Sequence, residues 1–246
     1  MVDHPIPFFC SLFLGLFVVV EIGYQVGLRT TGDGNDELRQ EIVAARDAIG
    51  VLLSLLLAFT LAMVLTRYDS RKQLIVNEAN AIGTVRLRAQ MLSEPLRSET
   101  LTLLRSYLDE RIRFTDAGLN EAELNPTLAR ANKLLDEIWQ KTFVVAPQSP
   151  TPITALFVQS LNDMTDLSES RLAALENRVP GTLWMVLIFI SMVMCLLVGC
   201  TLRRKAILIL LIWPLMISIV MALCADLDSP RKGLIRIGQQ SMERLR

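Results

Sequence analysis

Four long apolar runs, separated by charged segments, constrain this chain more than any other feature of its sequence. They lie at about residues 6–20, 48–66, 181–202 and 206–225. Each of the last three holds roughly 20 residues, enough to cross about 30 Å of hydrocarbon as an α-helix. The first run is shorter before it meets Glu21. With a first helix placed at residues 6–28, the sequence predicts four membrane spans.

The composition agrees with a division of the chain into membrane and aqueous parts. Hydrophobic residues make up 52% of the 246 positions, yet 20% are charged. Such a mixture is unusual for a soluble domain, so the two kinds of residue must be segregated along the chain. The formal net charge is zero, which gives no indication of a nucleic-acid partner.

The first apolar run has two interpretations, a retained span or a cleaved signal peptide. A signal peptide usually has a basic leader and a small-residue cleavage site. The leader "MVDHP" has no Lys or Arg, and no A-x-A pattern closes the run. We therefore expect a retained span.

The residues that usually carry chemistry are sparse. All four cysteines lie within apolar runs, where we expect small hydrophobic residues rather than disulfides or metal ligands. His4 is the one histidine of the sequence, and no phosphate-binding loop or nucleophile elbow is present. We expect no cofactor, no metal and no enzymatic activity.

A polar block of residues 67–179 separates the second span from the third. It shows no alternating strand pattern, and its capping residues and prolines are placed as at the ends of helices. Ser93 is an expected N-cap with Pro95 in the first turn, and Thr151 before Pro152 is another. An apolar stripe with helical spacing follows the first of these caps, at Leu101, Leu104, Leu108 and Ile112. The fold class is therefore all-α, with a helical extramembrane domain inserted between spans 2 and 3 and a polar C-terminal segment at 226–246.

The second span has two kinds of residue on different sides of its helix. Small residues recur every four positions, at Gly50, Ser54, Ala58 and Ala62. Small residues allow close packing between helices in lipid. Bulky residues follow the other side, at Leu52, Leu56, Phe59 and Met63. This bulky stripe faces either lipid or a pore. Similar small-residue spacing at Gly23 and Gly27, and at Ser191, Cys195 and Gly199, predicts close packing throughout the bundle.

Polar residues at the span ends have open interpretations. Glu21 and Gln25 lie one helical turn apart near the end of the first span, and form either an ion-pathway or inter-helix site or an interfacial pair. Asp226 and Asp228 directly follow the last span. They indicate either a cation site or a collar of salt bridges.

Two segments carry a resemblance to a known family. "RYDSRKQLIVNEANAIGTVRLRA" follows the second span and "LDSPRKGLIRIGQQSM" follows the last. Together they resemble the bacterial bestrophin-like membrane proteins, more distantly the bestrophins, over nearly the whole chain. The resemblance implies a pentameric ion channel in which the second helix of each subunit lines a narrow apolar neck. It also implies that the helical block is cytosolic, in a multi-pass protein of the bacterial inner membrane.

The polar residues at the ends of spans 2 and 4 form a predicted polar joint between the spans and the helical block. If the second helix continues past the bilayer, Ala79, Ala81 and Gly83 provide close contact for another helix, and Glu78 pairs with Arg71, Arg231 or Arg236. We favour a scaffold role over ion binding for this joint. Its members are Arg67, Asp69, Arg71, Glu78, Asn80, Asp226, Asp228, Arg231 and Arg236.

The leading functional hypothesis is a homo-oligomeric channel or pore, with the lipid bilayer and inorganic ions as partners. Four helices of one chain cannot both enclose a hydrated path and pack on each other. Rings of bulky side chains on the second span would then exclude ions until wetted. The rival hypothesis is a non-conducting scaffold or sensor whose helical block binds a partner. A membrane enzyme would require Glu21, Glu78 and Asp226 to converge.

Overall fold

The chain folds into two compact units. A computed structural model describes residues 5–30, 36–116, 121–148, 150–202, 205, 207–230, 233–235 and 237–246. The span unit contains residues 1–68 and 178–235. The helical unit contains residues 69–177 and 236–246. Each unit is described by itself below.

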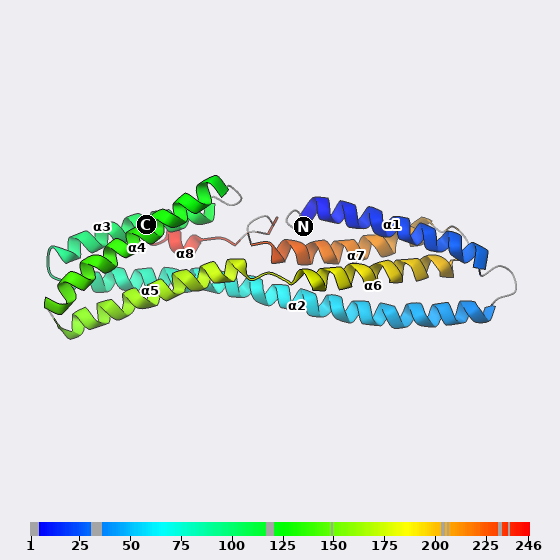
Figure 1. The fold of residues 1–246 in the computed structure, drawn as a ribbon, viewed down its shortest axis with the longest axis horizontal. Coiled ribbons are helices and arrows are strands. Elements are labelled where there is room, and N and C mark those ends of the chain that lie inside the picture. The colour runs from blue at the N-terminus through cyan, green and yellow to red at the C-terminus, as the bar shows by residue number, and fades with distance from the viewer. Residues whose placement is uncertain are drawn as a thin grey trace. The chain divides into compact units, whose positions relative to one another are not determined.

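All of the regular structure in the described ranges is helical, which confirms the predicted all-α class. In chain order the elements are α1 (Pro5–Thr30), α2 (Asp36–Ala89), α3 (Leu96–Asp116), α4 (Glu121–Val145), η1 (Ala146–Gln148), α5 (Pro152–Glu176), α6 (Gly181–Thr201), α7 (Ile207–Asp228) and α8 (Gln240–Glu243). Helices α1, α2, α6 and α7 contain stretches long and apolar enough to cross a membrane. The protein is therefore a four-span helical membrane protein with a helical domain between spans 2 and 3 (Figure 1).

Helix α2 contributes to both units. It has 54 residues without interruption, which at 1.5 Å per residue is about 80 Å. The hydrocarbon core of a bilayer is only about 30 Å thick. The second helix is therefore long enough to continue past the bilayer, which is the condition set above for the polar joint.

The span unit is a helical bundle in which α1 and α6 run parallel, with an aromatic contact at one end and a hydrogen bond at the other. At one end, Phe8 of α1 meets Trp184 of α6 edge to face at 5.7 Å between ring centroids. At the other, the Arg39 guanidinium of α2 donates to the Thr201 carbonyl at 2.6 Å. We call the end with the Phe8–Trp184 contact the joint end. There α6 begins and α2 passes out of the span unit.

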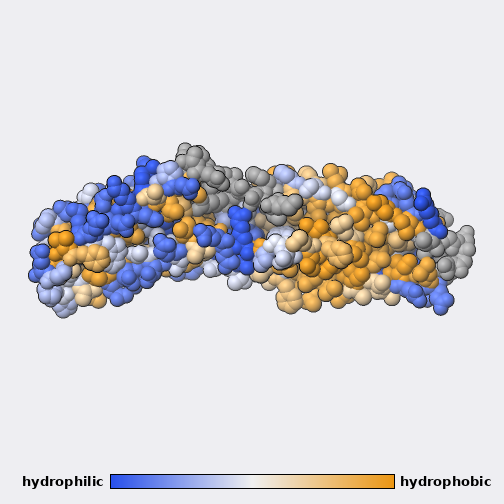
Figure 2. Space-filling model, in the orientation of Figure 1, coloured by the Kyte–Doolittle hydropathy of each residue, from blue (hydrophilic) through white to orange (hydrophobic). Residues whose placement is uncertain are grey.

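The core of the span unit is apolar, and so is its outer surface. Leu16, Val20, Leu187 and Met221 are among its fully buried side chains. Large apolar side chains also cover the outside, as the orange face of this unit in Figure 2 shows. Such an exposed apolar surface is expected where lipid is the solvent.

Glycines bring α1 and α6 into backbone contact. A Cβ atom on Gly23 would collide with the Leu196 carbonyl oxygen, and one on Gly27 would lie 2.6 Å from the Cys200 oxygen. A Cβ on Gly199 would collide with the Val20 carbonyl. The close packing predicted for these glycines is confirmed, since no larger residue fits without moving a helix.

The helical unit packs the second half of α2 against α3, α4, α5 and α8. Its core includes Ile82 and Val85 of α2, Leu104 of α3, Ile138 of α4 and Phe157 of α5. In the predicted α3 stripe, Leu104, Leu108 and Ile112 are buried and Leu101 packs partly buried against them. Ala79 and Ala81 are also buried, and Gly83 lies against Leu245.

One predicted helix cap is confirmed and one is wrong. Thr151 caps α5, because its hydroxyl accepts from the Thr154 N–H at 3.1 Å with Pro152 in the first turn. Ser93 does not cap α3, which begins at Leu96. The Glu94 carboxylate instead accepts from the Ser98 N–H at 3.1 Å and binds Arg97. A carboxylate one residue later satisfies the free helical N–H.

Candidate functional site

The candidate pore wall is the membrane-spanning part of α2. One side of this segment packs on the bundle through Leu53, Thr60 and Val64, which are at most 4% exposed. Leu56 and Met63 of the predicted bulky stripe are half-buried against the same core. Leu52 and Phe59 point outward, 47% and 65% exposed. A single chain therefore covers half of the stripe and leaves the other half open.

The small residues of α2 are also mostly uncovered in one chain. Gly50 is half-buried, and a Cβ there would lie 3.2 Å from the Met194 methyl group. Ser54, Ala58 and Ala62 are exposed. Two adjoining parts of the α2 surface are thus left uncovered by the other helices of the chain in the described structure. One part holds Leu52 and Phe59, and the other holds Ser54, Ala58 and Ala62. Its pore-lining and packing roles stay predictions.

Glu78 is the most deeply buried charge of the helical unit. Its side chain has no exposed surface. The Arg111 Nε of α3 lies 2.6 Å from Oε1, and the Arg171 Nη1 of α5 lies 2.6 Å from Oε2. The two arginine side chains are 1% and 4% exposed. One carboxylate thus joins three helices, and we call Glu78, Arg111, Arg171 and Tyr107 the buried cluster.

Burial and charge set the protonation of this cluster. Burial raises the pKa of Tyr107 to about 12, and its hydroxyl lies 3.5 Å from the Glu78 Oε1. Burial lowers the pKa of Arg171. Burial is also the largest single influence on Arg111 and acts to lower its pKa, but the charge of Glu78 and the hydrogen bond to it, added to smaller effects, give a net rise. The two guanidinium groups therefore stay charged at neutral pH, and the phenol keeps its proton. Two cations and one anion in a dry core serve to hold helices in one arrangement.

The sequence prediction paired Glu78 with Arg71, Arg231 or Arg236. It missed Arg111 and Arg171, which lie 33 and 93 residues after Glu78 in the chain. One sequence signal points to them. Arg111 follows Leu108 by three positions and Leu104 by seven, so it continues the buried stripe of α3. Arg171 follows the buried Met164 of α5 by seven. An arginine that continues an apolar stripe requires a buried partner.

The other members of the predicted polar joint are distributed over both units. In the helical unit Arg71 is buried at 3% exposure, while Asp69 and Asn80 are exposed. Arg231 and Arg236 lie outside the described residues. Arg67, Asp226 and Asp228 belong to the span unit.

Asp226 and Asp228 bind main-chain groups of the span unit. The Asp226 oxygens accept from the N–H groups of Leu234 at 2.5 Å and Ile235 at 3.0 Å. Both Asp228 oxygens accept from the Val179 N–H, at 3.1 and 3.2 Å. The Arg67 Nη1 lies 3.8 Å from the Asp228 Oδ1. Within the described ranges, no group of three or more potential ligands could hold a metal ion. Main-chain groups thus hold both carboxylates, with an ion pair from Arg67 to Asp228, and the choice between a collar and a cation site stays a prediction.

Glu21 lies at the opposite end of the span bundle. Its carboxylate meets the Lys205 ammonium, in the connection between α6 and α7, at 2.8 Å. Gln25 is exposed. Both partners of the Glu21 ion pair are partly exposed, which favours the interfacial interpretation over an ion pathway.

Comparisons with known proteins agree with this architecture. A family model described as the bestrophin-like domain matches residues 14–242. A crystal structure of a bacterial bestrophin homolog from Klebsiella pneumoniae, with a tyrosine-to-alanine mutation, has a TM-score of 0.65 at 15% identity, covering 97% of this chain and 94% of that one. A tryptophan-to-alanine mutant of that homolog has a TM-score of 0.66 at 13% identity, covering 96% and 94%.

No curated protein matches the chain. The match of the family model nevertheless extends over most of the sequence, and the two structures share the fold from end to end. The chain belongs to the bestrophin-like family.

Proposed function

We propose that the protein is a homo-oligomeric ion channel whose pore wall is formed by α2 of each subunit. The observation that carries the proposal is the uncovered α2 surface, on which Leu52 and Phe59 point away from the rest of the chain. The resemblance to the bestrophins supports conduction, and it implies a pentamer. Inorganic ions and the bilayer are then the partners of the protein.

The arrangement of residues on α2 suits a ring of subunits. Successive residues of an α-helix are about 100° apart around its axis, so Ala58 and Phe59 face different directions. If Phe59 and Leu52 face the central axis, Ala58 and Ala62 face a neighbouring subunit. Small residues permit a close contact there, while rings of Phe59 and Leu52 form an apolar neck that excludes ions until wetted.

The membrane segments proposed are residues 6–28, 48–66, 181–202 and 206–225, with 67–179 as the extramembrane domain. The family resemblance supports placing the helical domain in the cytosol of a bacterium, below the inner membrane. A reporter that is active only in the cytosol, fused after Arg246, tests this orientation. An inactive fusion in stably expressed protein would contradict it.

Cross-linking tests the ring. In a Cys10→Ser background, Phe59→Cys should form disulfides between subunits on oxidation, because the side chains converge at the axis. Phe189→Cys is the matched control, since Phe189 on α6 is 66% exposed and Phe59 is 65% exposed. A monomeric mass in detergent, or equal cross-linking at both positions, would contradict the proposal.

Ion flux into liposomes tests conduction itself. Conducting multimers support the channel. Intact multimers that stay silent in wild type and in neck variants would instead support a non-conducting scaffold or sensor.

A further inference from the structure

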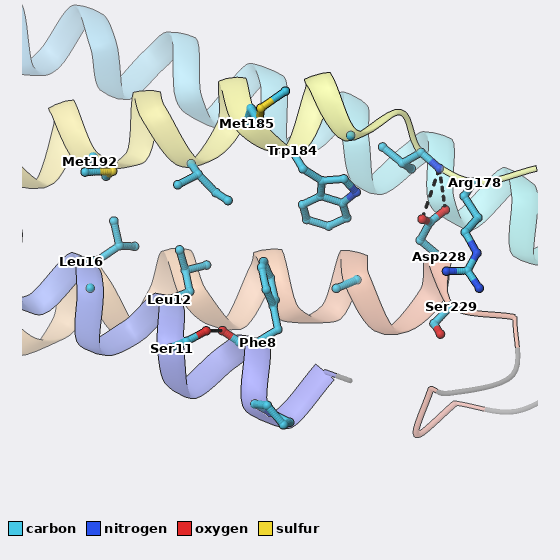
Figure 3. A pocket seen from close by; sticks show the side chains of 16 residues that line it. Phe8, Ser11, Leu12, Leu16, Arg178, Trp184, Met185, Met192, Asp228 and Ser229 are labelled. Carbon is cyan, nitrogen blue, oxygen red and sulfur yellow. Dashed lines mark hydrogen bonds between the residues drawn. The ribbon is translucent and has the colours of Figure 1, made fainter. Parts of the chain in front are cut away.

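A long cavity of about 1090 Å³ lies in the span unit, between α1, α6 and the end of α7 (Figure 3). Most of its wall is apolar. Phe8, Leu12 and Leu16 of α1 line one side, and Trp184, Ile188 and Met192 of α6 line the other. We call this cavity the α1–α6 groove.

The length of the groove matches one leaflet of a bilayer. Its α6 wall runs from Gly181 to Met192, twelve residues whose eleven steps of 1.5 Å rise about 16 Å. Half of the roughly 30 Å hydrocarbon core is about 15 Å. The groove begins at the joint end of the bundle, where α6 starts, and its apolar wall therefore covers the depth reached by a lipid acyl chain.

The end of the groove near the start of α6 is polar and holds charged side chains. Arg178, Asp228 and Ser229 line it. The Asp228 carboxylate already accepts from the Val179 N–H and pairs with Arg67. The Arg178 guanidinium lines the same end and supplies a cationic group to it.

Ser229 supplies a second, independent sign of a ligand. It is 7% exposed, and its Oγ has no hydrogen-bond partner in the described structure. A buried hydroxyl without a partner is costly. By contrast, Ser11 in the apolar wall donates to the Phe8 carbonyl at 3.0 Å and needs no ligand. The buried hydroxyl without a hydrogen-bond partner, that of Ser229, therefore lies at the end of the groove that holds the charged side chains.

Gly15 of α1 lies on the wall of the groove, where there is open space. A Cβ on Gly15 would meet no atom within 4 Å. The opposite wall is held in place by the edge-to-face contact of Phe8 with Trp184. The groove is therefore a fixed hollow on a helix surface that lipid surrounds.

We propose that the α1–α6 groove binds an anionic phospholipid of the surrounding bilayer. One acyl chain lies along the apolar wall. The phosphate lies at the end of α6, where Arg178 supplies the charge and Ser229 donates a hydrogen bond. The depth of the wall and the position of the cation both fit a lipid that enters from the leaflet on the joint end. This site is independent of whether the protein conducts.

Quenching of Trp184 fluorescence by brominated lipids tests the proposal. Trp139→Phe with Trp213→Phe leaves Trp184 as the reporter in the full chain. Brominated phosphatidylglycerol should quench it at a lower mole fraction than brominated phosphatidylcholine. Arg178→Gln should raise the mole fraction of phosphatidylglycerol needed for half quenching about tenfold, because a charge-assisted contact is lost. Gly15→Phe should abolish quenching by filling the groove.

A second reporter controls for folding. With Trp139→Phe and Trp184→Phe, the lipid-facing Trp213, 42% exposed on α7, should be quenched equally by both lipids in every variant. Equal quenching of Trp184 by the two lipids would overturn the proposal, as would unchanged quenching in Gly15→Phe. No quenching of Trp184 by either lipid would also overturn it, and would show that a neighbouring subunit covers the groove.

Discussion

Replacing Glu78 by alanine should be among the most damaging single changes in the helical unit. The substitution removes both ion pairs of the carboxylate, to Arg111 and Arg171, at once. Both guanidinium groups remain in a core from which water is excluded, and their like charges then face each other. Arg111 has no alternative acceptor in the described structure, since its Nη1 and Nη2 already have no hydrogen-bond partner.

The magnitude follows from the cost of an uncompensated buried charge. Breaking a buried ion pair by removing one partner costs about 3–5 kcal/mol. For a chain of this size, that loss corresponds to a decrease of about 6–20 °C in the midpoint of thermal unfolding. Glu78→Gln should cost less than Glu78→Ala, because the amide oxygen still accepts one hydrogen bond.

Thermal unfolding of the purified protein in detergent measures the effect, with Asp69→Ala as the matched control on the same helix. Asp69 is exposed, so its removal should change the midpoint little. A double-mutant cycle with Arg111→Met should recover part of the loss, because the unpaired cation is then removed as well. The reasoning fails if Asp69→Ala is as damaging as Glu78→Ala.

Three further predictions follow from named contacts. Gly23→Ala should destabilise the protein by about 1–3 kcal/mol in thermal unfolding, because the new Cβ meets the Leu196 carbonyl. Gly15→Ala should be neutral, and equal effects of the two changes would contradict the backbone contact between α1 and α6. Ala58→Leu should reduce the oligomer mass measured in detergent, and an unchanged mass would show that this position faces lipid. Burial raises the pKa of Tyr107 to about 12, so the folded state keeps a phenol proton that the unfolded chain releases near pH 10. Stability should fall by about 2–3 kcal/mol as the pH rises from 10 toward 12, and an equally steep fall in Tyr107→Phe would refute that origin.

Local patterns predict most of the fold. The apolar runs identify the spans, and the Thr151 cap and the α3 stripe identify helices of the polar block, because each depends on residues close in sequence. The glycine spacing of α1 predicts close packing as well. The start of α3 is missed, since the choice between Ser93 and Glu94 as cap depends on the local path of the backbone.

The sites are harder to predict because they depend on packing between distant segments. Glu78 is recognisable as an unusual charge among alanines, but its partners come from α3 and α5. The α1–α6 groove is a gap between two helices, and nothing in either sequence alone reveals it. The surroundings of Phe59 in the proposed oligomer depend on contacts between chains, which no pattern within one sequence specifies.

Ion flux through Phe59→Ala tests the central claim most directly. Wild type, Phe59→Ala and the control Phe189→Ala are reconstituted into liposomes at matched oligomeric state, and flux is recorded under one salt gradient. Removing the ring should widen and wet the apolar neck, because dewetting depends on the radius and polarity of the wall. The account predicts higher flux in Phe59→Ala than in wild type, with Phe189→Ala unchanged. Flux that is the same in all three proteins would contradict a pore wall formed by α2.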